Sequence, residues 1–349
     1  MKKIGIGIVG LGLAVKPHAL ALKDLAAKVD VIGGFSPSAS RRAAFAQAWE
    51  MPVVDRLAAL LDNPRVDAVL ILTPPRAHAE VTIAAARAGK HVLLEKPVDV
   101  DLPQARTLVE EVERCDRKLA VVFQHRFRPG SLALRDLLLE NALGALLSAS
   151  ASIRWWRPAE YYAQAGRGMK ARDGGGVLLS QAIHTLDLLL DLVGPAETVM
   201  AACRTSSLRS IDTEDVACAT VTYANGAIGV IDATTVAYPG YPERIELAGT
   251  RGSAVLEGER LVVQIAGKSL RVVEGSSAGG GGVDPMAFSH GPHKLLIEDF
   301  VDAVREDRPP RTLGRSALPV HALIDAMLAS SAQRAPVTIT IESGRTISR

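Results

Sequence analysis

The order of apolar and amphipathic segments in the first third of the chain constrains its fold more than any other feature. Apolar runs rich in β-branched residues predict strands at residues 4–9, 29–35, 66–72, 91–94 and 119–123. Helical patterns separate these runs, near residues 18–27, 38–49, 78–88 and 102–115. The runs are apolar throughout instead of alternating, as expected when helices cover both faces of a sheet. We therefore predict an α/β domain with a doubly wound parallel sheet over residues 1–124.

The pattern changes after residue 124. A long apolar helix is expected at residues 178–193, and short strands with turn signals follow one another from residue 197 to residue 274. Asn225-Gly226 lies between two β-rich runs, and this dipeptide is the strongest short-range signal for a hairpin. We predict a second domain over residues 125–349, of the α+β class, with a largely antiparallel open sheet.

Length, charge and cysteine content exclude several classes of protein. A chain of 349 residues is long enough for two domains. Its formal net charge of +2 gives no general electrostatic reason to expect nucleic acid or an anionic membrane as a partner. The cysteines Cys115, Cys203 and Cys218 lie far apart in the sequence, so neither a disulfide framework nor a zinc site is indicated. We predict a cytoplasmic protein that binds neither nucleic acid nor membranes.

A glycine turn directly follows the first predicted strand. Gly10-Leu11-Gly12 stands between this strand and a helix, the context in which such glycines bind the pyrophosphate of a dinucleotide. Gly10 permits a tight turn, and Gly12 lets the backbone approach phosphates at the helix N-terminus. Leu13 follows in the same turn, and Val15 occupies the position that usually holds Gly or Ala. We predict a dinucleotide-binding Rossmann domain; the alternative is a glycine-rich turn without a ligand.

The end of the second predicted strand carries hydroxyls and guanidinium groups instead of a carboxylate. A Rossmann domain selective for NAD usually has Asp or Glu here for the ribose hydroxyls. Ser36, Ser38 and Arg41 with Arg42 stand there instead, and arginine is suited to bidentate contacts with a 2′-phosphate. These residues favour NADP over NAD as the cofactor. In the alternative interpretation, Ser36 or Ser38 only caps the next helix and the arginines are solvated.

Further motifs follow the later strands. Glu95-Lys96-Pro97 ends the fourth predicted strand. It is accompanied by Thr73-Pro74-Pro75, His78, Gln124-His125-Arg126-Phe127, Asp173-Gly174-Gly175-Gly176, His184 and Asp187. With these motifs the sequence resembles the glucose–fructose oxidoreductase, inositol dehydrogenase and MocA (Gfo/Idh/MocA) family over nearly its whole length. Glu-Lys-Pro at the end of a strand is the most specific signature of that family.

The resemblance implies an NAD(P)-dependent dehydrogenase or reductase whose lysine and histidine flank the nicotinamide and the reacting carbinol. These residues are Lys96 and His184 in this sequence. Lys96 also follows the carboxyl end of a strand, where open α/β sheets bind ligands and an ammonium group steadies negative charge on oxygen. His184 lies near the start of an apolar helix, and imidazole suits proton exchange with an alcohol. Asp187, three residues further, either orients His184 or faces another direction.

The remaining candidates bind cofactor or substrate. The predicted cofactor-binding residues are Gly10, Gly12, Leu13, Ser36, Ser38, Arg41, Thr73, Pro74, His78, Glu95, Lys96 and Gln124. Ser180 stands where many inositol-dehydrogenase-like members have Asp, and Gln181 follows it. The predicted substrate-binding residues are Arg126, Trp155, Tyr162, Arg167, Ser180 and Gln181. Aromatic faces stack on sugar rings and arginines hold anions, although a packed domain or subunit interface is an equally good interpretation of the aromatic and basic residues. No cluster of His, Asp or Glu has metal-ligand spacing, so we predict no metal.

These observations predict an enzyme that transfers a hydride between nicotinamide and a secondary alcohol or ketone of a sugar, polyol or sugar acid, nucleotide-sugars included. Two alternatives belong to other classes. One is a glycosidase of the same fold that oxidises its substrate transiently with bound NAD. The other is a non-enzymatic dinucleotide-binding protein, because a fold alone does not establish activity. We expect a homo-oligomer, a dimer or tetramer formed through the C-terminal sheet.

Overall fold

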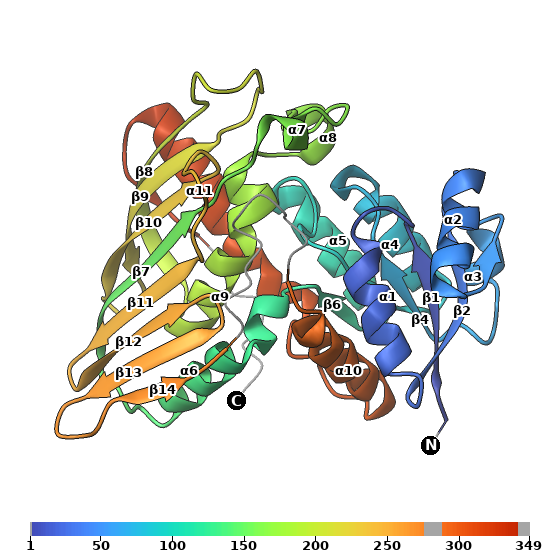
Figure 1. The fold of residues 1–349 in the computed structure, drawn as a ribbon, viewed down its shortest axis with the longest axis horizontal. Coiled ribbons are helices and arrows are strands. Elements are labelled where there is room, and N and C mark those ends of the chain that lie inside the picture. Colours follow the sequence, from blue (N-terminus) through green and yellow to red (C-terminus); the bar gives the residue numbers. More distant parts are fainter. Residues whose placement is uncertain (1, 276–287, 341–349) are drawn as a thin grey trace. The chain divides into compact units, whose positions relative to one another are not determined.

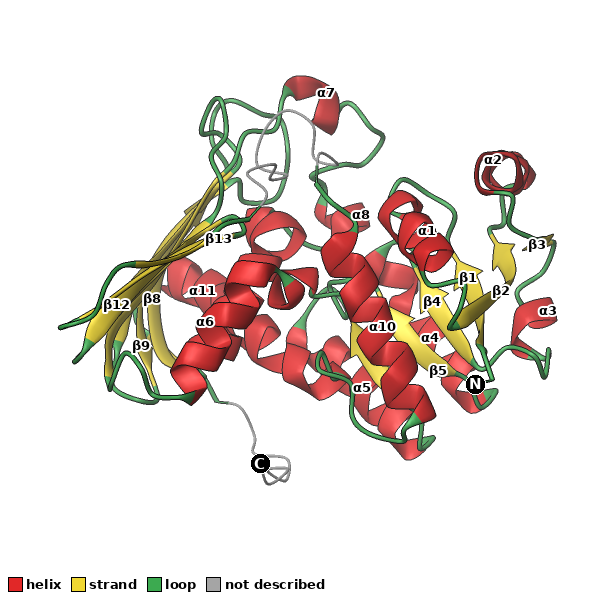
Figure 2. Ribbon diagram, turned by 60° about the horizontal axis from the view of Figure 1, so that its bottom comes forward, coloured by secondary structure: helices red, strands yellow, loops and turns green. Residues whose placement is uncertain are grey.

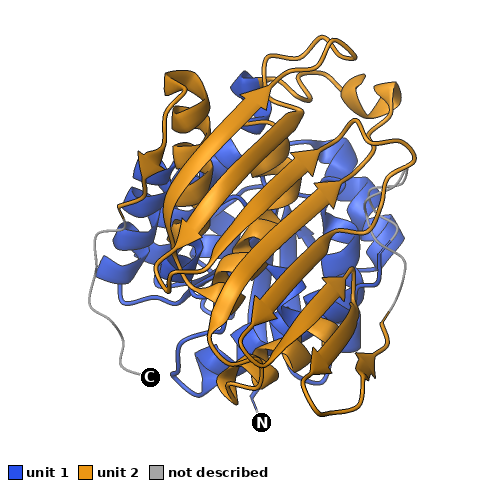
Figure 3. Cartoon of the chain, turned by 90° about the vertical axis from the view of Figure 1, so that its left-hand side faces the viewer, with its two compact units in different colours: residues 1–128, 170–174, 288–317 blue, residues 129–169, 175–287, 318–349 orange. Residues whose placement is uncertain are grey.

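The computed structural model describes residues 2–275 and 288–340 and forms two compact units (Figure 3). Unit 1 comprises Met1–Arg128, Lys170–Gly174 and Phe288–Ala317. Unit 2 comprises Pro129–Met169, Gly175–Ala287 and Leu318–Arg349. We predict a single boundary between the domains, after residue 124. The chain instead leaves unit 1 after residue 128 and returns to it twice, at residues 170–174 and 288–317.

Unit 1 is built on a six-stranded parallel sheet with the order β3-β2-β1-β4-β5-β6 (Figure 1). Its strands are β1 (Ile4–Val9), β2 (Val29–Phe35), β3 (Val53–Val54), β4 (Ala68–Ile71), β5 (His91–Leu94) and β6 (Leu119–Val121). The five predicted strands are confirmed, and the two-residue β3 is an addition at one edge. The order reverses at β1, so the carboxyl ends of β1 and β4 border the point where open α/β sheets bind their ligands.

Helices lie on both faces of this sheet (Figure 2). They are α1 (Val15–Asp24), α2 (Ala39–Trp49), α3 (Ala58–Leu61), α4 (His78–Arg87), α5 (Leu102–Arg114) and α10 (Gly291–Arg305). The unit also has 3-10 turns at Pro75–Ala77, Gln124–Phe127 and Gly314–Ala317, and the short α8 (Lys170–Asp173) lies beside the first of them. α10 comes from the distant C-terminal part of the chain. Its Leu296, Ile297 and Phe300 join the buried cluster that contains Ile6 and Leu22, which explains the return of the chain to unit 1.

Unit 2 contains a nine-stranded sheet with the order β14-β13-β12-β11-β7-β10-β9-β8-β15. Its strands are β7 (Leu146–Arg154), β8 (Ala196–Arg204), β9 (Val216–Tyr223), β10 (Ile228–Thr234), β11 (Arg244–Gly249), β12 (Gly252–Glu257), β13 (Arg260–Ile265), β14 (Arg271–Val273) and β15 (Val337–Thr338). β10 pairs with β7 in parallel, and the other pairs between the described strands are antiparallel. The predicted hairpin joins β9 to β10, with Gly226 at a φ of 86°.

Three longer helices of unit 2 pack against one face of its sheet: α6 (Pro129–Leu139), α9 (Ile183–Val193), which follows a π-helical turn at Leu178–Ala182, and α11 (Leu318–Gln333). The short α7 (Ala159–Tyr162) lies in the loop after β7. α6, α9 and α11 contact the strands, and Figure 3 shows no described helix of unit 2 over the opposite face. Among the described helices, the stretch Lys170–Val193 is long and apolar enough to cross a membrane, but 89% of its most apolar window is buried, as in a core helix.

Candidate active site

The glycine turn after β1 has the geometry that a closely approaching ligand requires. Gly10 has a φ of 100°, and a Cβ on it would lie 2.6 Å from the carbonyl carbon of Leu72. Only glycine therefore fits where this turn meets the end of β4. No described atom lies within 4 Å of a Cβ built on Gly12, so space remains beside the backbone just before α1. Leu13 is exposed in the same turn, and Val15 is buried in the core.

Two predicted cofactor-binding residues carry polar atoms that are buried and unsatisfied. Thr73 Oγ1 and Gln124 Oε1 have no hydrogen-bond partner among the described residues. Thr73 lies just beyond β4 and Gln124 just beyond β6, both at the carboxyl edge of the sheet, and the neighbouring Pro74 is exposed. Buried polar groups normally have a partner, so these two atoms fit a site that a polar ligand completes. Together with the open backbone at Gly12, they fit a dinucleotide.

The end of β2 combines a helix cap with a buried hydroxyl. Ser38 Oγ accepts a hydrogen bond from the backbone N–H of Arg41 at 3.3 Å and caps α2, which confirms the capping interpretation for this residue. Ser36 is buried, and its Oγ accepts from the N–H of Ser38 at 3.4 Å. Arg42 donates to the carbonyl oxygen of Ser36 at 2.7 Å, whereas Arg41 is exposed. Of the two guanidinium groups, Arg41 is thus the better placed for a phosphate.

His78 clamps two turns of the ligand-binding edge together. Its buried ring places Nδ1 2.8 Å from the carbonyl oxygen of Pro97 and Nε2 2.8 Å from that of Thr73. A neutral ring donates to one of these carbonyls, and only a protonated ring donates to both. Burial lowers the pKa of His78 and outweighs the opposite effect of the two carbonyls. Because both nitrogens face the backbone, His78 holds the Lys96-Pro97 turn in place. The cofactor contact that we predict for it stays a prediction.

Glu95 supports the same turn from the other side. Its Oε1 lies 2.9 Å from Nε2 of the buried His18, and its Oε2 accepts the backbone N–H of Lys96 at 3.0 Å. The ring of His293 meets that of His18 edge to face, with centroids 5.1 Å apart. Burial lowers the pKa of His293 to about 3, so this ring is neutral near pH 7. Glu95 therefore acts on Lys96 through the backbone.

His18, Glu95 and His293 also bring three possible metal ligands within 4.8 Å of one another. No spacing in the sequence indicates this cluster, because its members come from α1, the end of β5 and α10. Burial alone would raise the pKa of Glu95, but the hydrogen bond to His18 and the electrostatic effects of His18 and Lys96 lower it, so this single carboxylate is already stabilised in its charged form. Burying a further divalent cation there would leave excess positive charge unpaired, which is costly in a protein interior. We interpret the cluster as hydrogen-bonded support for the Lys96 turn.

In unit 2, the partly buried carboxylate of Glu214 holds the start of the helix that carries His184. Glu214 Oε2 accepts the N–H of Gly176 at 3.2 Å, and its Oε1 accepts the N–H of Leu178 at 3.0 Å. A Cβ on Gly176 would lie 1.9 Å from the carbonyl oxygen of Glu214, so the glycine run permits this close approach. Burial raises the pKa of Glu214 although these N–H groups oppose the effect. His184 and Asp187 follow on α9 and are almost fully buried.

The turn before α9 is π-helical, a geometry that occurs frequently at functional sites. Ser180 Oγ donates to the carbonyl oxygen of Gly175 at 3.0 Å, so this hydroxyl closes its own turn. Gln181 Nε2 donates to the hydroxyl of Tyr161 at 3.1 Å and links the turn to the loop after β7. The substrate contacts of Ser180 and Gln181 stay predictions.

The loop after β7 stacks guanidinium groups on aromatic rings. Arg157 lies 5.0 Å from the ring centroid of Trp155 and 5.6 Å from that of Tyr161, and Arg167 lies 5.0 Å from the centroid of Tyr161. Cation–π contacts of this kind add to the backbone hydrogen bonds that Trp155 and Arg157 donate to Thr234 and Thr235. Tyr161 is absent from our prediction, which selects its neighbour Tyr162. Because α7 has only four residues, its sequence has no periodic pattern that would distinguish the roles of the two tyrosines.

Arg126, predicted as a substrate contact, belongs to unit 1. Its side chain is buried, lies over the ring of Phe123 at 5.9 Å and donates to the carbonyl oxygen of Ser316 at 3.4 Å. These contacts hold the guanidinium in the 3-10 turn after β6, close in sequence to Gln124. Its role in substrate binding stays a prediction.

Two family models match the chain. Residues 4–123 match the oxidoreductase family with an NAD-binding Rossmann fold, and residues 131–255 match the GFO/IDH/MocA C-terminal domain. The first match ends at residue 123 and the second begins at residue 131, close to the point where the pattern of the sequence changes. They cover all strands of the parallel sheet and the segment that contains the glycine run and His184.

Known proteins resemble the chain over nearly its full length. Inositol 2-dehydrogenase of Rhizobium meliloti is 26% identical over 96% of this chain and 99% of its own. Levoglucosan dehydrogenase of Pseudarthrobacter phenanthrenivorans is 27% identical over 97% of this chain and 99% of its own. Among solved structures, the WlbA dehydrogenase from Bordetella pertussis in complex with NADH and UDP-GlcNAcA is 27% identical, with a TM-score of 0.82 over 98% of this chain and 100% of that one.

Proposed function

Because this chain belongs to the Gfo/Idh/MocA family of NAD(P)-dependent oxidoreductases, we propose that it transfers a hydride between nicotinamide and a secondary alcohol or ketone. The substrate is a sugar, a polyol or a sugar acid, nucleotide-sugars included. The observation that carries the proposal is the ligand-binding edge of unit 1. There Gly12 leaves the backbone open, Thr73 carries an unsatisfied hydroxyl, and Lys96 is fixed between Glu95 and the His78 clamp. The names of the relatives support a carbohydrate-like substrate.

We assign the chemistry as follows. Bound nicotinamide supplies the acceptor or donor for the hydride. Lys96 orients the reacting oxygen of the substrate and stabilises the negative charge that develops on it. His184 exchanges the hydroxyl proton, and Asp187, one helical turn further, orients His184. Ser180 has no carboxylate and its hydroxyl already bonds to the backbone, so the proton exchange rests on His184.

An activity screen separates this function from its two alternatives. Mass spectrometry of the purified protein would identify any nucleotide that co-purifies, and a panel of sugars, polyols and nucleotide-sugars would then be tested with NAD and NADP. Stoichiometric reduction of the cofactor supports a dehydrogenase. Cleavage of a glycoside without net cofactor turnover would identify the glycosidase instead. Binding of nucleotide with neither reaction would favour a non-enzymatic protein. The cytoplasmic location remains a prediction.

We further propose that NADP is the preferred cofactor, with its 2′-phosphate held by Ser36, Ser38 and Arg41. The wild-type protein is then expected to bind NADPH about ten- to a hundredfold more tightly than NADH, since a charge-assisted contact contributes about 1.5–3 kcal/mol. Ser36→Asp should reverse the preference, because a carboxylate repels the phosphate and accepts from the ribose hydroxyls. Arg41→Ala should equalise the two affinities. Calorimetric titration measures all three, and tighter binding of NADH by the wild type would refute the assignment.

We propose that the chain assembles as a dimer or tetramer through the uncovered face of the unit 2 sheet. Met200 and Val230 flank Thr220 in one row across β8, β9 and β10, and Ile228 lies beside them; the three apolar side chains are more than half exposed. Large apolar side chains gathered on one exposed face of a sheet favour an interface. Light scattering should give a multiple of 36.9 kDa, and Val230→Glu should shift the mass towards one chain. Val53→Glu, on β3 of unit 1, is the control. A wild-type monomer would contradict the proposal.

A further inference from the structure

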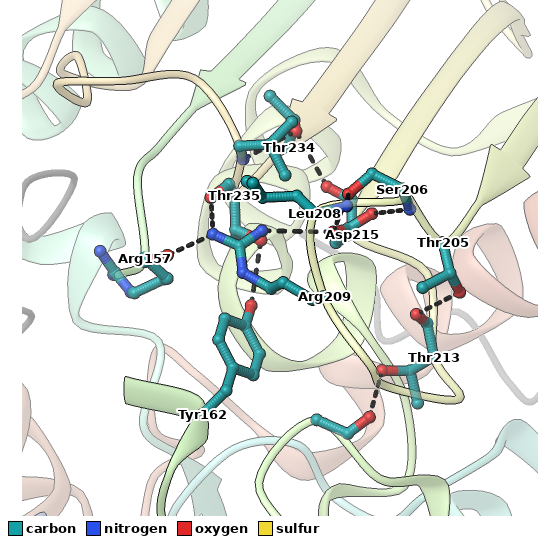
Figure 4. Close-up of polar contacts among 12 residues, drawn as sticks. Arg157, Tyr162, Thr205, Ser206, Leu208, Arg209, Thr213, Asp215, Thr234 and Thr235 are labelled. Atoms are coloured by element: carbon teal, nitrogen blue, oxygen red, sulfur yellow. Dashed lines mark hydrogen bonds and ion pairs between the residues drawn. The ribbon is translucent and has the colours of Figure 1, made fainter. Parts of the chain in front are cut away.

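A buried arginine joins the loop regions at one end of the unit 2 sheet (Figure 4). Arg209 donates to Oδ2 of Asp215 at 3.2 Å, to the carbonyl oxygen of Thr235 at 2.9 Å and to the carbonyl oxygen of Arg157. The side chains of Arg209 and Asp215 are only 6% and 1% exposed, so this ion pair is almost completely desolvated. Asp215 also accepts from the N–H of Ser206 at 2.6 Å and from its hydroxyl at 2.7 Å. The carboxylate is therefore satisfied by three donors, which makes the buried pair tolerable.

The same guanidinium is enclosed by aromatic rings. It lies 4.7 Å from the ring centroid of Tyr162 and 5.4 Å from that of Trp156. The hydroxyl of Tyr162 pairs with Oγ1 of Thr235 at 3.0 Å. Arg209 therefore ties together three segments that are distant in sequence: the loop after β7, the loop between β8 and β9, and the end of β10.

This network determines where α7 lies, and α7 leads to the candidate site. Tyr161 is the neighbour of Tyr162 in α7, and its hydroxyl accepts from Gln181. Gln181 belongs to the π-helical turn directly before the helix of His184. We infer that Arg209 is a positioning residue that fixes the loop of residues 155–169 for substrate binding, acting through Tyr162 and Tyr161 on Gln181. The inference rests on the proposed function, which assigns this loop to the substrate.

Lysine should not replace Arg209. The planar guanidinium reaches a carboxylate and two carbonyls while it stacks between two rings, whereas an ammonium group keeps the charge but cannot make these contacts together. R209K therefore keeps a positive charge beside the carboxylate of Asp215 but loses the contacts that position the loop. T235V is an independent variant, because it removes the hydroxyl partner of Tyr162 and keeps the ion pair intact. R154K is the matched control, since Arg154 pairs with Asp232 on the same sheet but is more than half exposed.

The experiment has two arms on the full-length protein with bound cofactor. Hydrogen exchange should accelerate over residues 157–169 in R209K and T235V, with exchange in β9 and β10 unchanged and R154K like the wild type. With a carbinol found in the activity screen, KM should rise about tenfold while kcat and the affinity for cofactor stay nearly constant.

Two results would overturn the inference: unchanged exchange over residues 157–169, or a loss of kcat in proportion to the folded fraction with KM unaltered. If the wild type turns over no carbinol, the proposed function fails. The exchange arm still decides whether Arg209 orders the loop.

Discussion

Replacement of Lys96 with alanine is expected to lower the rate of hydride transfer by about a thousandfold, while the affinity for cofactor changes little. The backbone of this lysine is held on both sides, by Glu95 at its N–H and by His78 at the carbonyl of Pro97. The backbone that carries the ammonium group is therefore fixed before the substrate binds. Charge that is preorganised in this way lowers the activation free energy of hydride transfer. Single-turnover measurement of nicotinamide absorbance reports the transfer step directly.

The matched control is Lys23→Ala, which removes a half-exposed lysine from the last turn of α1 in the same unit. Its rate should equal that of the wild type. Lys96→Arg tests geometry against charge, since it keeps a cation on a longer and planar side chain. Hydride transfer at the wild-type rate in Lys96→Ala would remove this residue from the mechanism. A large loss of cofactor binding with a normal transfer rate would instead assign Lys96 to the cofactor.

The parts of the fold and site that could be predicted from the sequence are those with local causes. Gly10 follows a continuously buried strand by one residue, and the tight turn required there is a property of its own backbone. The hairpin at Asn225-Gly226 is likewise encoded in two residues and their flanking strands. Lys96 could be placed at the ligand-binding edge because every parallel strand ends there.

The features that escaped prediction depend on contacts between distant segments. His293 contacts His18, more than 270 positions away in the sequence, because the apolar face of α10 packs in the core of unit 1. Glu214 binds the start of the His184 helix from a loop 36 residues away, and no motif marks it. Arg209 looks like any surface arginine in sequence, and only its three backbone and carboxylate partners show otherwise.

The prediction for His184 concerns proton exchange, and its readout is the pH dependence. His184→Gln should lower kcat/KM by about 10²–10⁴-fold, the usual contribution of a positioned general acid or base. Glutamine keeps a hydrogen-bonding side chain of similar length but does not titrate, so the remaining activity should lose the limb of the pH profile near neutrality. Asp187→Asn should give a smaller loss, because it removes only the proposed orienting carboxylate. Steady-state kinetics between pH 5 and pH 10 measure both effects.

His91→Gln is the control for the pH profile. Burial lowers the pKa of His91 to about 4, so this ring is already neutral across the range measured and its loss should leave the profile unchanged. His293, whose pKa burial lowers to about 3, is neutral over the same range and does not shape the profile either. A near-neutral limb that survives in His184→Gln must therefore come from another group, and His184 would then be a buried residue of α9 with no part in proton exchange.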